Sequence, residues 1–465
     1  MSQPGKIRFR HKTNPGRLTI KSKPKYPKVP DDSEIGSESV ETKVKRSIEQ
    51  LGMRVDLEGT ARYCGIMLRH RVIQSATDLL RLIFMYSLYD CSLREVGLWG
   101  TVTELGSLSK TAILKQLRKC RIWMGVLIVV VLAAQKIRFP RLPGIHLRLI
   151  DASTVSKPGS HQADWRLHVS FDLGQAGIDD IQLTDGHQGE TLTRWQFQRG
   201  DICLADRAYG VPRSLGILFG SLAWFVIRMG WQNLPLQTVE GQSFRVMDWL
   251  RVLSADPQAS PAQTRVWVDT PQGRFPLRLV ARAIPSEKAE KIRRRMTAEA
   301  KRKKRKIDER SLFAAGFVMV VSNLPDTNWS AAQILALYQV RWQIECVFKR
   351  LKSILHFDHL RSKDPQIAQV YLLAKILSAL LVGEIQSRFI HQDPQRFTSQ
   401  ERPVSYWGFT KIIYEALRET IRGKFTIALL LKHWSKLGRY LSDEPRRRIQ
   451  QFTAVRLSLG LVCGF

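Results

Sequence analysis

The sequence predicts an α/β protein in which a core of strands and helices is divided by a mainly β insertion and flanked by helical regions. Apolar runs at 146–151 and 201–206 each end in an aspartate, as buried strands often do. Apolar and polar residues alternate at 165–173, which is typical of a half-buried strand. The segments 43–136 and 367–388 have the periodicity of helices instead.

The composition favours a globular protein with a polyanionic partner. Lys and Arg number 73 against 41 Asp and Glu, which gives a formal net charge of +32. This charge exceeds what solubility requires and predicts sequence-independent attraction to DNA. Hydrophobic residues make up 44% of the chain, enough to build packed cores. The six cysteines form no CxxC pair, so we expect reduced thiols in a cytoplasmic protein rather than a zinc site or disulfides.

The N-terminus and two apolar runs decide whether a membrane is involved. Residues 1–42 are basic and proline-rich, which predicts a flexible basic arm and no secretory signal. The run 126–134 is much shorter than the roughly 20 residues that a membrane span needs. The run 367–382 carries Lys375 in its middle. We therefore expect two core or interface helices and no membrane partner.

Residues 43–139 are predicted to form a helical DNA-binding region. Two short helical segments, 91–97 and 108–119, are joined by a turn that contains glycine, as in a helix–turn–helix motif. Ser109 is a suitable N-cap for the second helix. The cations that would contact the DNA backbone are Lys110, Lys115, Arg118 and Lys119. An ordinary helical bundle with charged faces explains the pattern equally well.

Residues 140–230 are predicted to hold the first part of the core. Strands at 146–151, 165–173 and 178–183 precede a short helix at 190–197, a fourth strand at 201–206 and a fifth at 223–228. Asp151 and Asp206 each follow an apolar strand, which makes them candidate ligands for a hard metal ion. Four other acids lie at strand starts or turns and are expected to be solvated there: Asp179, Asp180, Asp185 and Asp201.

Residues 231–314 are predicted to be a β-strand insertion with a basic segment. The 139 residues that separate Asp206 from Glu345 exceed what a bare core needs. The pattern predicts a strand at 244–253 and a hairpin of strands at 265–269 and 275–279. The segment 288–310 is densely basic, which favours a grip on DNA over a merely solvated face.

Residues 315–362 are predicted to be the second part of the core, and 363–465 a helical C-terminal region. Tyr338, Arg341, Glu345 and Lys352 stand at offsets of three, seven and fourteen residues, which places their side chains within about 60° of one another on an α-helix. Apolar residues occupy the adjoining face. The stretch 338–352 is therefore predicted to be one helix whose polar stripe faces a cleft; the alternative is a surface helix with salt-bridging charges.

This spacing resembles the signature of the bacterial cut-and-paste transposases of the insertion sequence 4 family. The strand and turn at 320–325, the tryptophan after the signature arginine, and Asp-Arg-Ala-Tyr at 206–209 also resemble family motifs. The resemblance implies a ribonuclease-H-like (retroviral-integrase-like) α/β core, interrupted by a mainly β insertion subdomain. It also implies that Asp151, Asp206 and Glu345 form an Asp-Asp-Glu triad.

By the same resemblance, the protein is a DNA transposase that nicks a transposon end, excises it through a hairpin and joins the 3′-hydroxyl to target DNA. The triad would hold two Mg²⁺ ions, with Mn²⁺ as a substitute. The implied DNA-binding residues are Tyr338, Arg341, Trp342, Lys352 and Arg207. Trp231, Trp249 and Trp267 are candidates for stacking on a flipped base.

The implied partners are terminal inverted repeats and target DNA, bound by a homodimer in a synaptic complex. The expected location is the cytoplasm of a prokaryote, in association with the nucleoid. Two alternatives stay open on the sequence alone. One is a ribonuclease-H-like endonuclease without strand transfer, and the other is a catalytically silent DNA-binding regulator.

Overall fold

The structure is a computed structural model that describes residues 55–67, 72–138, 146–160, 162–255, 261–392 and 404–423, with single positions between 430 and 441. The basic arm expected at residues 1–42 lies outside the described residues. So does most of the C-terminal region after residue 423.

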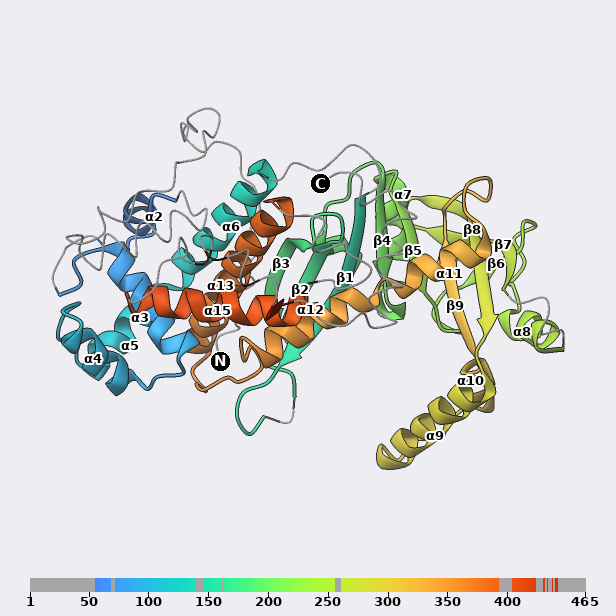
Figure 1. Ribbon diagram of the computed structural model, residues 1–465. Coiled ribbons are helices and arrows are strands. Elements are labelled where there is room, and N and C mark those ends of the chain that lie inside the picture. Colours follow the sequence, from blue (N-terminus) through green and yellow to red (C-terminus); the bar gives the residue numbers. More distant parts are fainter. Residues whose placement is uncertain are drawn as a thin grey trace.

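Nine strands form one mixed sheet in the order β3-β2-β1-β4-β5-β9-β8-β7-β6 (Figure 1). Their bounds are β1 His146–Val155, β2 Trp165–Asp172, β3 Gly177–Asp185, β4 Asp201–Ala205, β5 Trp224–Arg228, β6 Leu236–Gln237, β7 Ala262–Thr270, β8 Gly273–Ala283 and β9 Phe317–Ser322. The five strands expected in the first part of the core are confirmed, as is the hairpin expected in the insertion, which is β7 and β8.

The pairing of the strands brings several chain positions to one end of the sheet. β1, β4 and β5 are parallel neighbours, β9 runs antiparallel to β5, and β8 runs antiparallel to β9 and so in the direction of β5. Arg228, the last residue of β5, pairs with Val320, and Ala283, the last residue of β8, pairs with Phe317. β4, β5 and β8 therefore all finish at the end where β9 begins. Asp206 directly follows β4 there, and we call this the acid end of the sheet.

Side chains that alternate along each strand separate two apolar layers. On one face, Leu149 and Leu204 belong to the core that packs against α6 (Arg121–Arg138), α11 (Ala331–Gln339), α12 (Trp342–Ser353) and α13 (Pro365–Gln392). On the other face, Ile150 and Ala205 pack with α7 (Pro212–Gly220) and α8 (Val246–Ala255). Asp151 and Asp206 follow Ile150 and Ala205, so alternation directs their side chains toward the face that carries α12.

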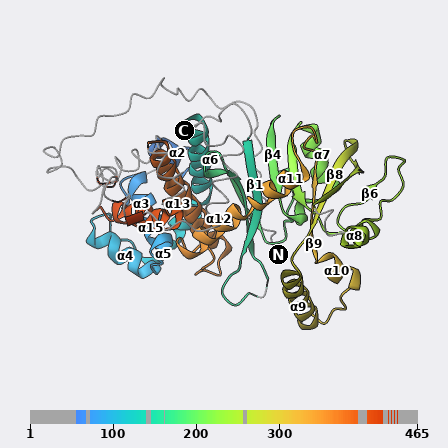
Figure 2. The same cartoon turned by 45° about the vertical axis from the view of Figure 1, so that its right-hand side comes forward.

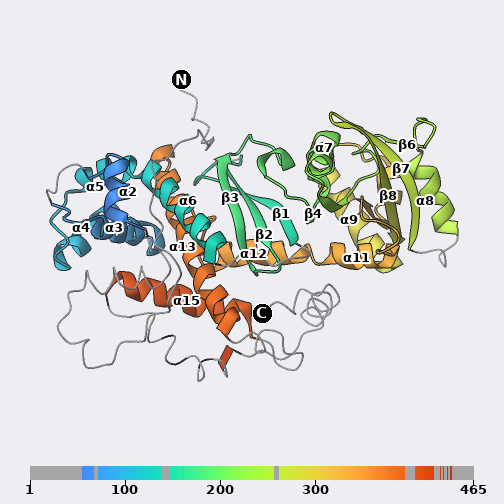
Figure 3. The same ribbon diagram turned by 90° about the horizontal axis from the view of Figure 1, so that it is seen from above.

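A helical region lies beside the β3 side of the sheet (Figure 3). The long helix α13 is its centre and contacts α6, α3 (Ala76–Leu88), α5 (Lys110–Lys119) and α15 (Tyr406–Ile421). The region also holds α2 (Leu57–Tyr63) and α4 (Leu93–Val102). By length and composition α13 is apolar enough to cross a membrane, but 89% of its most apolar 18-residue window is buried inside the protein. It has the burial of a core helix.

Two short helices form where the sequence predicted a helix–turn–helix. Ser92 begins α4 with a capping box that includes Glu95. The Ser109 hydroxyl accepts a hydrogen bond from the backbone N–H of Ala112, so it caps α5 as expected. Gly106 has a φ of 127° in the turn between them, a backbone conformation that L side chains rarely adopt. The pair of helices and its turn are therefore confirmed.

Two expected elements are wrong. Residues 244–253, expected to be a strand, lie mostly in helix α8, whose buried residues Val246, Met247, Leu250 and Leu253 recur at helical spacing. A short apolar run fits either element, and here packing on the sheet decides for a helix. The helix expected at 190–197 is only one 3₁₀ turn, η2 Leu192–Arg194.

The basic segment forms its own element beside the sheet. It becomes α9 (Ser286–Arg302), followed by the short α10 (Glu309–Ala314) and then β9. The turned view in Figure 2 shows α9 standing out below the sheet, next to α10.

Candidate active site

Asp151 and Asp206 lie side by side although 55 residues separate them in the chain. β1 and β4 are parallel neighbours, and their pairing ends with Ile150 opposite Ala205. The next residue on each strand is the aspartate. Asp151 was expected at the end of its strand, but β1 continues to Val155 in its pairing with β2. The acid is instead placed where β1 passes beyond the end of β4.

Glu345 reaches the same place from α12. The helix expected at 338–352 is interrupted, because α11 ends at Gln339 and α12 begins at Trp342. Between them the backbone makes tighter bonds of the 3₁₀ type, from the N–H of Arg341 to the carbonyl of Tyr338 and from Ile344 to Arg341. Glu345 therefore shares a helix with Lys352, two turns further on, while Tyr338 belongs to the preceding helix.

The guanidinium group of Arg341 lies between two of the acids. Its NH1 atom is 3.3 Å from a carboxylate oxygen of Asp151, and its NH2 atom is 2.7 Å from one of Glu345. The two carboxylates are thus separated by no more than one guanidinium group and two short contacts. Asp206 also interacts electrostatically with Arg341. The structure therefore brings the three acids together around a single cation.

Burial disfavours the charged form of two acids at this site. The Asp151 carboxyl has a pKa raised to about 6, mainly because burial disfavours its charge, with Glu190 and Asp206 adding to the rise against the opposing effect of Arg341. The pKa of Glu190 is raised as well, again chiefly by burial. Glu190 is a fourth acid near the pair that the sequence did not single out. A site of this charge favours an additional cation.

A pocket of about 230 Å³ lies beside the acids. It is lined by Arg228, Arg282, Val318, Leu335, Tyr338, Gln339, Arg341 and Trp342. Tyr338 is 9% exposed, and its hydroxyl has no hydrogen-bond partner among the described residues. Three arginines and two aromatic rings make the pocket suited to a phosphate with an attached base. Arg228 and Arg282 were not among the predicted site residues, because only their position near the end of a strand indicates them in the sequence.

Of the other DNA-binding candidates, Trp342 lines this pocket, whereas Arg207 and Lys352 do not. Trp342 contributes to the lining, with the Lys349 ammonium 4.4 Å from its ring centre. Arg207 is exposed, and its backbone N–H donates to the carboxylate of Asp206 at 2.8 Å. Of the tryptophans proposed for stacking, Trp231, Trp249 and Trp267, none is among the residues that line the pocket.

The acids fit a divalent cation in chemistry but not in spacing. Three carboxylates offer the hard oxygen ligands that Mg²⁺ prefers. Within the described residues, however, no three His, Cys, Asp or Glu side chains stand close enough together to hold a metal ion. Arg341 occupies the space between Asp151 and Glu345 and supplies the positive charge there.

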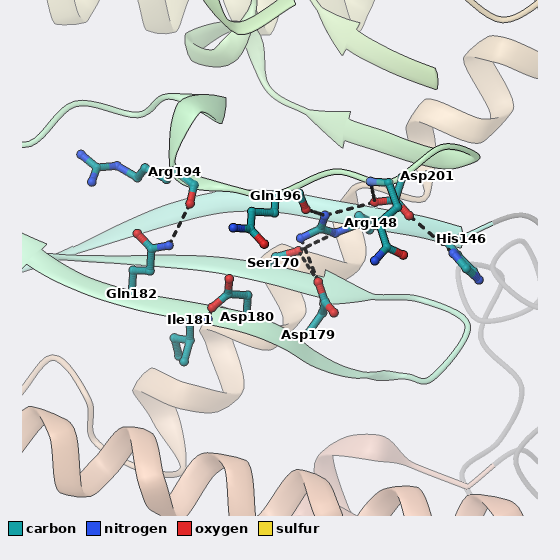
Figure 4. A network of polar contacts seen from close by, with 11 residues as sticks. His146, Arg148, Ser170, Asp179, Asp180, Ile181, Gln182, Arg194, Gln196 and Asp201 are labelled. Atoms are coloured by element: carbon teal, nitrogen blue, oxygen red, sulfur yellow. Dashed lines mark hydrogen bonds and ion pairs between the residues drawn. The ribbon is translucent and has the colours of Figure 1, made fainter. Parts of the chain in front are cut away.

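A second acid cluster corrects the expectation for Asp179 and Asp201. Both were expected to be solvated, but they are 6% and 0% exposed. Figure 4 shows Arg148 of β1 between them, with its guanidinium 2.9 Å from Asp179 and 3.2 Å from Asp201. Ser170 and the carbonyl of Gln196 accept further hydrogen bonds from it. The cluster joins β1, β2, β3 and β4 three residues before Asp151.

Comparison with known proteins agrees with this geometry. The model of the transposase DDE domain family matches residues 143–381, which include all three acids. The putative transposase InsL for insertion sequence element IS186A of Escherichia coli (strain K12) is 35% identical over 361 residues, which are 76% of this chain and 97% of that protein. The transposase for insertion sequence element IS421 of Escherichia coli is 34% identical over 362 residues, again 76% and 97% of the two chains.

A transposase for insertion sequence element IS231F of Bacillus thuringiensis subsp. israelensis is 29% identical over 245 residues, which are 48% of this chain and 51% of that protein. The match to the solved piggyBac transposase synaptic complex with hairpin DNA covers 89% of this chain and 84% of that one, at 11% identity and a TM-score of 0.42. The chain belongs to the insertion sequence 4 family of DDE transposases. Its function class is that of a DNA transposase.

Proposed function

We propose that this transposase cuts DNA at the ends of its insertion sequence and joins the freed 3′-hydroxyls to target DNA. The observation that carries the proposal is the convergence of Asp151, Asp206 and Glu345 around Arg341 at the acid end of the sheet. The acids are the proposed catalytic and metal-holding residues. The strand order β3-β2-β1-β4-β5, with β1, β4 and β5 parallel and β2 antiparallel, supports a ribonuclease-H-like core.

Once Arg341 moves from between Asp151 and Glu345, for instance to bind a DNA phosphate, the three carboxylates would hold two Mg²⁺ ions, or Mn²⁺ in their place. When bound, such ions activate the attacking oxygen and stabilise the leaving oxygen of a phosphodiester. The protein fixes the carboxylates on a rigid sheet and a helix. They therefore need little reorientation to reach the transition state.

The pocket next to the acids is the proposed holder of the DNA end. Arg341, Arg228 and Arg282 would bind terminal phosphates through charge-assisted hydrogen bonds, and the unpartnered Tyr338 hydroxyl would donate another. Trp342 offers an aromatic face for an unstacked base, which supports excision through a hairpin. Lys352 extends the cationic track along α12. An endonuclease without strand transfer has no need to retain an end in this way.

The helices α4 and α5 are the proposed reader of the terminal inverted repeats. Lys110, Lys115 and Lys119 are exposed on α5, whereas Ile113 and Leu117 anchor its other face. Because two ends must be cut and joined together, we propose a homodimer in the synaptic complex. Association with the nucleoid would follow from the net charge of +32.

Single substitutions of the acids test the proposal. Asp151→Ala, Asp206→Ala and Glu345→Ala should each reduce nicking and strand transfer with Mg²⁺ by at least about a thousandfold, because each removes a ligand that acts in the transition state. The substrate is a duplex that carries the inverted repeat bounding the gene. Binding of this duplex, measured by fluorescence anisotropy, should change by less than about threefold.

The matched control is Asp248→Ala at an exposed carboxylate of α8, which should cut and join like the wild type. Cleavage that survives in the variant with all three acids replaced would refute the assignment. Wild-type protein that nicks the ends but never joins them would favour the endonuclease. Wild-type protein that binds the ends without cutting would favour the silent regulator.

A further inference from the structure

We propose that α9 is an arm that binds duplex DNA beyond the transposon end, either the donor DNA that flanks the end or the target DNA. The inference rests on the proposed function and adds a partner to it. It concerns a surface outside the acids and their pocket, namely the helix from Ser286 to Arg302 and the turn that follows it.

The arm leaves the sheet at the acid end. α9 follows β8 and α10 precedes β9, and the last residue of β8, Ala283, pairs with the first residue of β9, Phe317. This is the end at which β4 delivers Asp206 and β5 delivers Arg228. Arg282 lines the pocket and precedes α9 by only four residues. Cations thus continue from the pocket directly into the arm.

Only the base of the arm is attached. Arg293 donates a hydrogen bond from its Nε to the carbonyl of Leu312 in α10, at 3.0 Å. Ala289 is the one residue of α9 that is buried. The remaining turns run on to Arg302 with exposed or half-exposed side chains. Figure 1 shows α9 extending below the sheet, away from the other helices apart from α10.

The charge on the arm is dense and arranged in a stripe. Residues 286–306 contain eleven Lys and Arg against three Glu. Lys288, Lys291, Arg295 and Arg302 are spaced so that they share an arc of about 60° on the helix. The arc faces away from Ala289, and all four side chains are exposed. The stripe is about 21 Å long, enough to follow phosphates along several base pairs.

The acids of the helix offset the charge of the stripe only in part, through the attraction of Glu299 for Arg295 and Arg302. Glu290 pairs with Arg293 and Arg294, and Glu299 pairs with Lys303. In the part of the chain that the structure describes, none of the four stripe residues forms an ion pair. Four exposed cations on one side of a rigid helix can therefore contact the phosphates of a duplex.

The helix lacks the apolar face that binding to an anionic membrane surface would need. A helix that binds a membrane surface carries an apolar face next to its cations. Here the residues between the cations include alanine and glutamate, and Ile292 is the single large apolar side chain of α9 that is exposed, at 39%. A duplex needs only the charges.

The position of the arm indicates which DNA it meets. The proposed reader helices α4 and α5 lie at one end of the molecule, and β1 and β4, which position the first two acids, lie between these helices and α9 (Figures 1 and 3). A duplex that runs from α4 and α5 to the acids has the inverted repeat on that side. The DNA on the other side of the cut is donor flank before excision and target at strand transfer.

Salt-dependent binding tests the arm. Lys291→Gln, Arg295→Gln and Arg302→Gln are combined, because glutamine keeps the helix propensity and removes three charges. Binding to a 30-base-pair duplex of arbitrary sequence is measured by anisotropy between 50 and 200 mM salt, with Ca²⁺ in place of Mg²⁺. The negative slope of log affinity against log salt concentration should become shallower by about three, since each lost phosphate contact removes about 0.9 from its magnitude.

The control combines three exposed arginines away from α9, Arg199→Gln, Arg251→Gln and Arg274→Gln. This variant has the same net charge as the α9 variant. If the stripe makes specific contacts, the control keeps the slope of the wild type to within about one. Equal slopes for the two variants would overturn the inference, because the charge of α9 would then act only as part of the total.

Two further substrates separate the sources of the DNA. If the arm holds donor flank, the wild type should bind an inverted-repeat duplex with a 15-base-pair flank about tenfold more tightly than the same duplex ending at the cut. The α9 variant should then lose this preference. Joining of pre-cut ends to a plasmid should fall about tenfold in the α9 variant if it holds target. No change in either assay would sink the inference. Wild-type protein that fails to cut inverted repeats would instead refute the proposed function.

Discussion

At the scale of single residues, the acid site combines three carboxylates with one internal cation. Arg341 contacts both Asp151 and Glu345, and its own pKa is raised against the effect of burial by Tyr338 and Asp206 as well as by these two acids. Asp151 nevertheless has a raised pKa, so the one arginine does not offset the loss of water around the buried acid. Function and stability therefore oppose each other at this residue.

The raised pKa predicts how stability depends on pH. The folded pKa of Asp151 is about 6 against an ordinary value of 3.8 for an aspartate, so the folded protein binds the proton more tightly than the unfolded chain. This contribution to stability is complete below about pH 4 and is lost as the pH rises through 6. With EDTA present, urea titrations at pH 7 should therefore give Asp151→Asn a free energy of unfolding about 2 to 3 kcal/mol higher than that of the wild type.

The difference between Asp151→Asn and the wild type should shrink as the pH is lowered to 5. Asp248→Asn, at an exposed carboxylate, is the control and should change the free energy of unfolding by less than about 0.5 kcal/mol. A variant less stable than the wild type at pH 7 would mean that the contact with Arg341 outweighs the burial of Asp151.

At the scale of elements, a buried ion cluster ties together the strands that carry the first two acids. Arg148 is 2% exposed and lies between Asp179 of β3 and Asp201 of β4, with the ring of Phe197 4.9 Å from its guanidinium carbon. Its strand delivers Asp151 three residues later. The cluster therefore fixes the position of β1 against its neighbours.

Arg148→Leu should destabilise the protein by about 3 to 5 kcal/mol, because it removes the buried guanidinium group that pairs with the carboxylates of both Asp179 and Asp201. Urea unfolding followed by circular dichroism measures this loss. Arg251→Leu removes an arginine from an exposed pair with Asp248 and should cost less than about 0.5 kcal/mol. A loss below 1 kcal/mol for Arg148→Leu would indicate that water reaches the two acids.

At the scale of the whole molecule, one continuous sheet connects the proposed catalytic core to the insertion. β5 pairs with β9, and β9 pairs with β8 of the insertion, so the pocket between Arg228 and Arg282 spans a junction of directly bonded strands. Figure 3 shows the helical region at one side of the molecule and the strands of the insertion at the other, with β1 and β4 between them. This order suits a duplex that crosses the acids.

The proposed synaptic complex predicts a change of assembly on DNA. Size-exclusion chromatography with light scattering should give two chains and two duplexes per complex when an inverted-repeat duplex is added with Ca²⁺. A scrambled duplex of the same length is the control and should give no complex of this stoichiometry. One chain per duplex under conditions that support strand transfer would contradict the dimer.

Much of the fold was predictable from local patterns. Apolar runs that end in Asp151 and Asp206, and the alternation at 165–173, predicted strands that formed, because strand periodicity is visible over a few residues. The strand predicted at 244–253 was wrong, since a short apolar run fits either a strand or a helix until its packing is known. The burial of Asp179 and Asp201 was also missed, because it depends on Arg148, a residue far from both in the chain.

The sequence by itself determined the family and the cationic character of the chain, and it supplied the three acids proposed for catalysis, because these depend on residue types and their spacing. Only the tertiary structure decided that Arg341 lies between Asp151 and Glu345, that Arg228 and Arg282 share its pocket, and that α9 leaves the sheet at the acid end. These relations join residues tens to hundreds of positions apart. Strand pairing and helix packing set them, and no local pattern records such contacts.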